Sequence, residues 1–399
     1  MEAISIKLIA LAVILANFFA SSLQSIQLDR PLFAEIYPEA VVENLWLAYR
    51  DKIQKDGRTL DRDRNYITTS EGQSYALLRA VWIDDKEIFD RVLKWTNNNL
   101  RERDDQLFAW LWGQKDGRWG VLKEEGGINS ASDADQDIAL ALIFAYKRWK
   151  QNHYLEQAKK ILADIWEKEV VILKERPYLV AGNWAKENNS YTINPSYFMF
   201  YAYPIFNEVD PAHDWLGLKD TSYQVLQVST LAPLDRKRSG NLPPDWISID
   251  PDTLRVQPAI YKDKKTDFSY DAFRVLWRVT LDWEWHKDKR AIDYLKSVGT
   301  LENEWMKRGS FSDSYHHDGQ PATKYENSSI YAGTYPYFSL IHPEIAKELY
   351  RKKLGRLYDS NTENFSKPLD YYSQNWVWFG FAFHAKKLPN LYLIEDEND

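Results

Sequence analysis

The sequence predicts an all-α protein whose helices pair into hairpins and close into a ring, with an inner layer wrapped by an outer one. Roughly a dozen segments carry apolar residues near the helical period of about 3.6, and almost none alternates as a strand does. The 16 glycines and 16 prolines are spread thinly over 399 residues, and no low-complexity linker follows residue 25. We therefore expect one large domain. An α-solenoid is the alternative, although no fixed repeat of about 30 to 45 residues is present.

The expected helices follow one another along the chain. The first has Val42 and Leu45 on one face, and the segment 138–149 is apolar almost all round, which predicts a buried helix. The polar residues 84–86 separate the second helix from the third. The expected helices cover 40–53, 74–83, 87–100, 138–149, 154–170, 196–206, 223–231, 270–285, 291–306, 343–354 and 373–383.

The N-terminus carries an apolar run, residues 8–20, that is broken only by Asn17. A membrane-spanning helix needs about 20 apolar residues, so this run is short for a span. The small residues Ala20 and Ser22 suit a cleavage site, and residues 1–22 therefore fit a secretory signal peptide. An uncleaved membrane anchor and a core helix are the alternatives. We expect a secreted or periplasmic protein.

Composition excludes several classes of protein. The net charge is −7 and no long basic run occurs, so nucleic-acid binding is not expected, because phosphate contacts need clustered Lys and Arg. The absence of cysteine excludes disulfides, thiolate metal sites and a cysteine nucleophile. The only histidine cluster, His316 and His317, lacks a partner at zinc-ligand spacing and is typical of a solvated loop.

Two carboxylates stand where helices are expected to begin. Glu71 lies in the segment 69–75, and Asp133 lies in the segment 131–139. Helix N-terminal electrostatics explains such acids without any catalysis, with Ser70 as the N-cap of the first of these helices. Carboxylate pairs also cleave glycosidic bonds, and the chain is 15% aromatic, which suits sugar rings bound on aromatic faces. The pattern therefore favours chemistry on carbohydrates.

Four segments resemble glycoside hydrolase family 8, and they occur in the order that the family has them. They are SEGQSY at 70–75, ASDADQDIALALIFAYKRW at 131–149, NPSYF at 194–198 and YDAFR at 270–274. The resemblance spans residues 65–385, nearly all of the chain after the expected signal peptide. It implies an (α/α)6 barrel over residues 23–399, with six inner and six outer helices, which acts as a single catalytic domain.

The family resemblance also implies an activity. It suggests an inverting, endo-acting hydrolase of internal β-1,4 bonds in cellulose-type glucans that needs no cofactor and no metal, similar to the endoglucanase associated with bacterial cellulose synthesis. The expected partners are a β-glucan polysaccharide or oligosaccharide and a polysaccharide synthesis or export system. A xylanase or chitosanase of the same family and an inactive glycan-binding component of an export system are alternatives. A polysaccharide lyase is disfavoured, since lyases need basic clefts.

By the same resemblance, Glu71 is the general acid and Asp271 the general base. An ion pair of Asp271 with Arg274, one helical turn away, explains that pair without catalysis. The two interpretations are compatible, because a guanidinium keeps a base ionised and can orient the attacking water. A helix start lowers the pKa of Glu71, so burial and a neighbouring carboxylate must raise it for an acid. Asp133 is the expected neighbour and a sugar-hydroxyl acceptor.

Fold geometry must bring these residues together, because the acid and the base lie 200 positions apart. Inner helices that begin at one rim of a barrel would place their first residues around one cleft. An inverting enzyme needs about 6.5–9.5 Å between its two carboxylates, so that a water molecule fits. Asp135 and Asp137, close to Asp133, are expected to be structural.

Aromatic residues complete the expected site. Tyr197 and Tyr270 resemble family tyrosines that line the region of the base and contact its water or the distorted sugar. Trp110 and Trp184 are the expected sugar stackers, because they lie in segments that resemble the family. The tryptophans in polar or loop-like surroundings, from which the floor of a cleft is expected, are Trp110, Trp112, Trp119, Trp184, Trp246 and Trp376.

Overall fold

The computed structural model describes residues 31–187, 189–261 and 264–394. The signal peptide or anchor expected over residues 1–22 lies outside these residues, and so does the expected boundary of the domain at residue 23. Within the described part of the chain, no helix combines the length and the apolar character that a membrane span requires.

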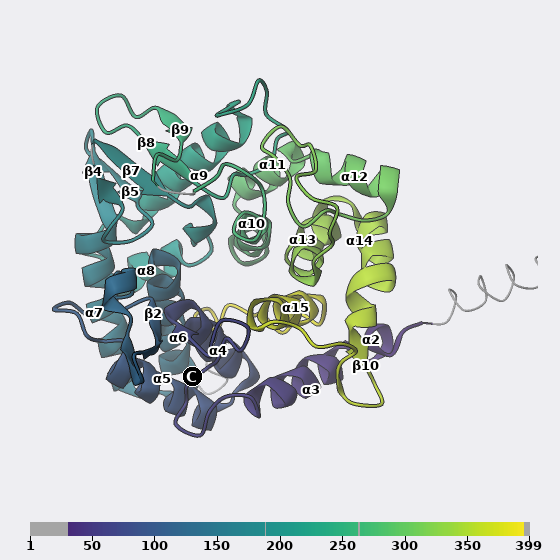
Figure 1. Cartoon of the computed structure of the whole chain (residues 1–399), viewed down its shortest axis with the longest axis horizontal. Coiled ribbons are helices and arrows are strands. Elements are labelled where there is room, and N and C mark those ends of the chain that lie inside the picture. Colours follow the sequence, from purple (N-terminus) through teal and green to yellow (C-terminus); the bar gives the residue numbers. More distant parts are fainter. Residues whose placement is uncertain (1–30, 188, 262–263, 395–399) are drawn as a thin grey trace, which may run out of the picture.

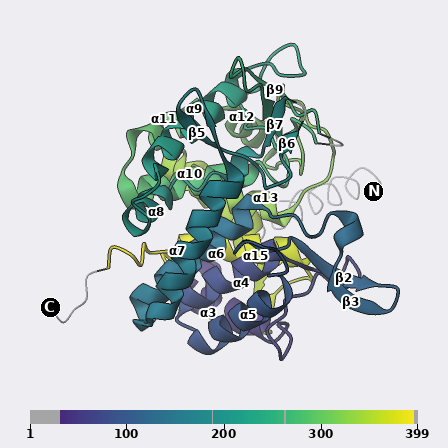
Figure 2. The same ribbon diagram turned by 90° about the vertical axis from the view of Figure 1, so that its left-hand side faces the viewer.

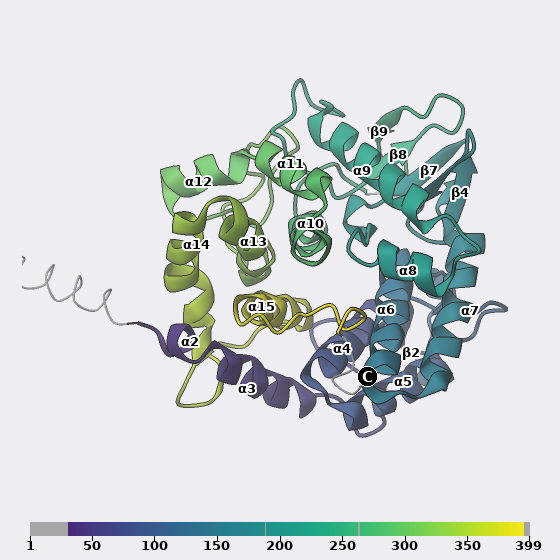
Figure 3. The ribbon, with the colours of Figure 1, turned by 180° about the vertical axis from the view of Figure 1, so that it is seen from behind.

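The described helices form six hairpins that follow one another around a ring (Figure 1). The inner layer consists of α4 (Ser70–Ile83), α6 (Ser132–Trp149), α8 (Tyr203–Val209), α10 (Phe273–His286), α13 (Ser328–Ile341) and α15 (Tyr371–His384). Their outer partners are, in the same order, α5 (Lys86–Asn99), α7 (Asn152–Glu169), α9 (Trp215–Leu231), α11 (Lys289–Ser297), α14 (Pro343–Leu349) and α3 (Pro38–Arg50). The short helices α2 (Phe33–Ile36) and α12 (Thr300–Arg308) extend the outer layer, as the view from behind shows (Figure 3).

The last inner helix closes the ring. Helix α15 packs against α13 on one side and α4 on the other, and α3, the outer helix with which it pairs, comes from the beginning of the described chain. Asn375 of α15 accepts a hydrogen bond from the buried Arg79 of α4 at 2.8 Å. The structure thus confirms the all-α, (α/α)6 barrel and excludes the solenoid.

Burial separates the two layers of the barrel. In α6 every residue from Ser132 to Ala145 is buried, in agreement with the expected buried helix. The outer helix α5 buries only one face, formed by Ile88, Phe89, Val92, Leu93, Trp95 and Thr96. An inner helix touches neighbours on both sides and an outer helix behind it, whereas an outer helix needs an apolar stripe alone.

Several helices differ from the predicted ones. Helix α13 was not expected, because Pro336 lies inside it and proline normally ends a helix. The segment 291–306 is two helices, α11 and α12, with Gly299 as the N-cap of the second. The segment 196–206 is the 3-10 helix η2 (Pro195–Tyr197), followed by the start of α8. Helix α9 begins at Trp215, eight residues before the predicted start.

Four small antiparallel sheets were not expected at all. Their strands have two to five residues, which is too short for an alternating pattern to be visible in the sequence. The strands are β1 (Thr68–Thr69), β2 (Leu111–Lys115) and β3 (Arg118–Val121); β4 (Val170–Leu173) and β5 (Arg176–Leu179); β6 (Lys186–Glu187), β7 (Ser190–Ile193), β8 (Ile247–Ile249) and β9 (Val256–Pro258); β10 (Tyr358–Asp359) and β11 (Asn364–Phe365). The β2–β3 hairpin projects beyond the barrel (Figure 2).

The inner helices α4, α6, α10, α13 and α15 begin at the same rim. The hydroxyl of Tyr371, the first residue of α15, donates to Glu71 in the first turn of α4, and the N-cap of α13, Asn327, bonds Tyr270 ahead of α10. The N-cap of α4 is Thr69, whose hydroxyl oxygen accepts from the amide of Gly72 at 3.0 Å. The expectation that Ser70 caps this helix was wrong, because the helix already begins at Ser70, one residue earlier than that cap would place it and four before the predicted start at 74.

The histidine cluster differs from the solvated loop expected for it. His317 is fully buried, and its Nε2 lies 2.8 Å from the carbonyl oxygen of Ala232. His316 lies 3.0 Å from a carboxylate oxygen of Asp267. Both histidines therefore fasten the loop to its neighbours.

Candidate active site

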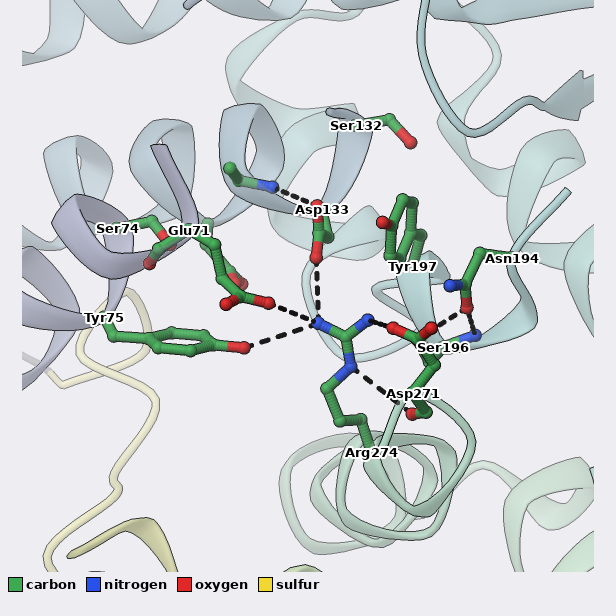
Figure 4. A network of polar contacts seen from close by, with 12 residues as sticks. Glu71, Ser74, Tyr75, Ser132, Asp133, Asn194, Ser196, Tyr197, Asp271 and Arg274 are labelled. Carbon is green, nitrogen blue, oxygen red and sulfur yellow. Dashed lines mark hydrogen bonds and ion pairs between the residues drawn. The ribbon is translucent and has the colours of Figure 1, made fainter. Parts of the chain in front are cut away.

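One guanidinium group, that of Arg274, binds three carboxylates at the rim (Figure 4). Its Nη1 donates to Glu71 Oε2 at 3.1 Å and to Asp133 Oδ2 at 2.9 Å, and its Nη2 donates to Asp271 Oδ1 at 2.5 Å. The hydroxyl of Tyr75 lies 3.3 Å from Nη1. Because neighbouring nitrogens of one planar group hold Glu71 and Asp271, the two carboxylates lie across the width of that group from each other.

The four charged side chains of this cluster differ in how much of their surface is exposed to solvent. Arg274 is 1% exposed and Asp133 is 4% exposed, whereas Glu71 is 22% and Asp271 30% exposed. Glu71 and Asp271 are therefore the two most accessible carboxylates of the cluster. Asp133 and Arg274 form the floor beneath them.

The surroundings of Glu71 keep a large share of its carboxyl protonated near neutral pH. Burial of the carboxyl is the main cause, and it raises the pKa of Glu71 to about 7. The charges of Asp133 and Asp271 also raise this pKa, while Arg274 and the hydrogen bond from Tyr371, at 2.5 Å, lower it. Burial thus outweighs the helix dipole, which is worth about 0.3–1 kcal/mol.

Asp271 lies in the turn just before α10, since the helix begins at Phe273 and not at 270 as expected. Both of its carboxylate oxygens accept hydrogen bonds, Oδ1 from Arg274 and Oδ2 from Nε1 of Trp246 at 2.9 Å. Arg274 Nε lies 3.3 Å from the carbonyl oxygen of Asp271. The carboxylate is therefore fixed in orientation from two sides.

The dipeptide Asp245-Trp246 supports this turn from beneath. The buried carboxylate of Asp245 accepts from the amides of Ser269 at 3.0 Å and Ala272 at 2.7 Å, on either side of Asp271. The ammonium of Lys264 lies 3.7 Å from the centre of the Trp246 ring. Burial and the charge of Asp271 raise the pKa of Asp245 to about 7.

The expected aromatic residues surround the cluster in different ways. Tyr197 lies beside it, with its ring centre 5.2 Å from the Arg274 guanidinium. The hydroxyl of Tyr270 is instead 3.3 Å from Asp313 and from Asn327, so the side chain is directed along the rim.

Trp110 and Trp184 are connected to the carboxylate cluster through other residues, Ser70 and Trp246 respectively. The indole of Trp110 donates to the carbonyl of Gly126 at 3.0 Å, and the Trp110 carbonyl accepts from the amide of Ser70, next to Glu71. The ring centre of Trp184 lies 4.7 Å from that of Tyr261 and 6.4 Å from that of Trp246. Stacking of sugars on Trp110 and Trp184 stays a prediction.

Other expectations from the sequence have clear outcomes. Asp135 accepts from the amide of Phe108 at 3.0 Å, and Asp137 pairs with Arg278 at 3.2 and 3.1 Å, so both are structural as expected. Trp376 is 1% exposed and Trp112 is 8% exposed, so both are core residues and not the floor of a cleft. Trp376 is buried because it lies in the inner helix α15, and Trp112 is buried because it packs against Trp95.

Sequence reasoning missed three residues of the site. Tyr75 lies within the segment 70–75 but was given no role, and Trp246 was only one of several candidate stackers. The sequence does not distinguish Tyr371 from a core residue, because an aromatic residue at a helix start usually packs in the core. In residues 31–187, 189–261 and 264–394, no three His, Asp or Glu side chains are grouped as ligands for a metal.

A ring of helical hairpins with an acid, a second accessible carboxylate and aromatic rings at one rim defines a glycoside hydrolase of the (α/α)6 class. The sequence profile of glycosyl hydrolases family 8 matches residues 32–373, and the chain belongs to this family.

Relatives and solved structures agree with this assignment. An endoglucanase of Salmonella typhi is 30% identical over 351 residues, which cover 84% of this chain and 87% of the relative. An endoglucanase of Xanthomonas axonopodis pv. citri is 37% identical over 246 residues, 60% of each chain. The crystal structure of an endo-1,4-D-glucanase from Vibrio fischeri ES114 has a TM-score of 0.71 and 25% identity, over 86% of this chain and 94% of the other.

Proposed function

We propose that the chain hydrolyses internal β-1,4 bonds of cellulose-type glucans with inversion of the anomeric carbon. The names of its relatives support the substrate, since those cited are endoglucanases. The placement of Glu71 and Asp271 on one guanidinium is the observation that carries the mechanism. In this proposal the glucan lies across the rim, between the two carboxylates.

Glu71 acts as the general acid. Its raised pKa, about 7, keeps the carboxyl protonated at the pH where the enzyme must donate a proton. It gives this proton to the oxygen of the leaving sugar as the bond to the anomeric carbon breaks. The second sugar then departs with a free hydroxyl group.

Asp271 acts as the general base. It takes a proton from a water molecule, whose oxygen attacks the anomeric carbon from the face opposite to the leaving group. The donors Arg274 and Trp246 hold the carboxylate in place and stabilise its charge. After each turnover Asp271 passes its proton to solvent and Glu71 is protonated again.

Asp133 and Tyr197 support the sugar on the glycone side of the cut. Asp133 Oδ1 accepts from the amide of Ala134 at 2.9 Å and Oδ2 from Arg274, and a carboxylate has about four lone-pair sites. A sugar hydroxyl can therefore still donate to Asp133. Its charge adds to the forces that keep Glu71 protonated.

Anomer-resolved NMR of cellopentaose hydrolysis tests the proposal. The first product signal is expected from the α-anomer, because a water attack on a β-linkage inverts the centre. A first product with the β-configuration would refute inversion. Parallel assays on xylan and chitosan test the substrate, and faster turnover of either would assign the chain to the xylanase or chitosanase alternative. Absence of turnover on all three, with binding retained, would favour the inactive glycan-binding protein.

We also propose that the protein is secreted or periplasmic and works beside a polysaccharide synthesis or export system. The apolar run 8–20 supports export. Fractionation of cells followed by N-terminal sequencing tests it: a mature chain outside the cytoplasm that begins near residue 23 is expected. Full-length protein in the membrane fraction would indicate the uncleaved anchor.

The pH dependence of the reaction follows from Glu71. Since the pKa of about 7 lies above the ordinary value, we expect kcat/KM to be sustained below pH 7 and to fall as the pH rises through about 7. A pH–rate profile on a soluble glucan measures this. Tyr371→Phe removes a hydrogen bond that lowers the pKa, so the alkaline limb should move to higher pH. A limb that moves to lower pH would contradict the assignment.

Trp246→Phe tests how the base is positioned. Loss of a hydrogen bond to a charged group is expected to reduce kcat about tenfold to a hundredfold, because the carboxylate of Asp271 is no longer held in orientation toward the water molecule. KM should stay nearly unchanged, because the groups that bind the sugar are not altered. Steady-state kinetics on cellopentaose measure both constants. Trp305→Phe is the matched control, since Trp305 donates to Glu348 at 3.1 Å on an outer helix. Equal kcat in the two variants would contradict this role.

A further inference from the structure

We propose that the β2–β3 hairpin and the loop before β1 carry a second binding site for a β-glucan chain, formed by the exposed rings of Trp119 and Tyr66, whose two segments Arg58 connects. This site, which we call the hairpin platform, deepens the proposed function and rests on it. It would hold polymeric glucan at the rim while the carboxylate cluster cuts it.

Trp119 is exceptional among the tryptophans of the chain. The sequence has 17 tryptophans, and among the described residues Trp119 is the most exposed of them, at 46%. Trp119 lies on the projecting hairpin, where its exposed indole presents an aromatic face on which the C–H groups of a sugar ring can stack. Figure 2 shows this hairpin extending away from the barrel.

The exposed ring is also rigid. Trp119 stacks on Trp112 with ring centres 5.1 Å apart and an interplanar angle of 17°, and Trp112 in turn meets Trp95 of the core edge to face at 5.2 Å. The three indoles therefore form a continuous series of ring contacts from the core to the surface. A ring fixed before binding costs little conformational entropy when a ligand arrives.

Arg58 links the hairpin to the loop that carries Tyr66. Its guanidinium carbon lies 4.6 Å from the ring centre of Trp112 and 4.5 Å from that of Trp119. Its Nη2 donates to the carbonyl oxygen of Tyr66 at 2.8 Å. One side chain therefore fixes both aromatic residues of the platform.

Tyr66 supplies an independent observation. Its φ is +57°, in the left-handed region that residues with side chains rarely adopt, and the ring is 54% exposed. Asn65 before it has φ +54°. Backbone strain of this kind persists only where the surroundings enforce it, and it is common in ligand clamps. Here the strained loop displays the phenol ring of Tyr66 to solvent.

The platform is continuous with the catalytic rim. Thr68 of β1 pairs with Trp112 and Thr69 pairs with Leu111, so the strand that bears the stack is bonded to the strand that leads directly into Glu71. A glucan is a long chain of identical neutral rings whose C–H faces stack on aromatic rings. One chain can therefore occupy a rim site and the platform, which raises the local concentration of bonds to be cut.

The test compares polymer binding with oligosaccharide turnover. Wild type, Trp119→Ala, Tyr66→Ala and the double variant are mixed with amorphous cellulose, and the protein left in solution is measured. Loss of one stacking ring is expected to weaken the affinity for cellulose about tenfold, and the double variant is expected to lose more affinity than either single variant. The value of kcat/KM on cellotetraose should stay within twofold of wild type, because the rings lie outside the carboxylate cluster.

Controls keep the result interpretable. Tyr37→Ala removes an equally exposed ring, 54%, from the outer layer and should leave retention unchanged. Trp119→Tyr keeps an aromatic face and should restore most of the retention. Circular dichroism and thermal melts identify any variant that does not fold, and the Trp119→Tyr rescue then decides the outcome.

Failure of the platform and failure of the proposed function look different. Wild type that cuts cellotetraose but is not retained by cellulose, or is retained equally by all variants, overturns the platform alone. Wild type that is retained through Trp119 but cuts no glucan supports the platform and overturns the catalytic proposal.

Discussion

Glu71→Gln is expected to reduce kcat by about 10²–10⁴-fold, the usual contribution of a general acid, while the affinity for oligosaccharide stays near that of wild type. The amide has nearly the size of the carboxyl, so Arg274 and Tyr371 keep a neighbour, but its N–H protons are not acidic enough to be transferred to the leaving oxygen. Single-turnover rates on cellopentaose and calorimetric titration of the same sugar measure the two effects separately.

A matched control for this variant is Glu169→Gln. Glu169 is also buried, burial raises its pKa to about 8, and it accepts from Ser130 at 2.6 Å, but it lies outside the carboxylate cluster. Its variant should keep the wild-type kcat. If Glu71→Gln retained more than a tenth of the wild-type rate, another residue would have to be the acid.

Arg274→Met is expected to abolish activity and to lower the free energy of unfolding by about 3–5 kcal/mol, because it leaves buried carboxylates without their counter-charge. Arg274 is 1% exposed and bonds Glu71, Asp133 and Asp271 at once. Since the guanidinium lowers the pKa of Glu71, its loss should raise that pKa above about 7. Denaturant unfolding and a pH–rate profile of any residual activity measure these changes.

Arg278→Met separates stability from catalysis. Arg278 lies one turn further along α10 and pairs with Asp137 of α6, so its loss should destabilise the fold to a similar extent. Its guanidinium donates to Asp137 and Tyr201, and not to the three carboxylates of the site, so folded enzyme should keep most of its kcat. Equal losses of kcat in both variants would show that Arg274 acts through stability alone.

The acids of the site could be predicted because they depend on local features. Glu71 and Asp133 stand in the first turns of helices, and the family resemblance singled out both together with Asp271. The shared role of Arg274 could not be predicted. Its ion pair with Asp271 joins residues only three positions apart and is visible in the sequence. Its other partners, Glu71 and Asp133, lie 203 and 141 positions away.

Long-range contacts explain the other missed residues as well. Tyr371 reaches Glu71 across 300 positions and Trp246 reaches Asp271 across 25, and only the closed fold brings them together. The helical period predicted most of the barrel, because inner and outer helices both bury apolar faces. It failed at α13, where Pro336 interrupts the pattern, and in sheets whose strands are shorter than the pattern needs.

The closure of the barrel by α15 has a consequence for protein synthesis. The final inner helix supplies Tyr371 to Glu71 and Asn375 to the buried Arg79, so a nascent chain has neither contact until residues 371–384 have left the ribosome. Partial chains should therefore have no activity, and not a reduced one. A stop codon shortly before this helix would act as a null allele, although it would spare all three carboxylates.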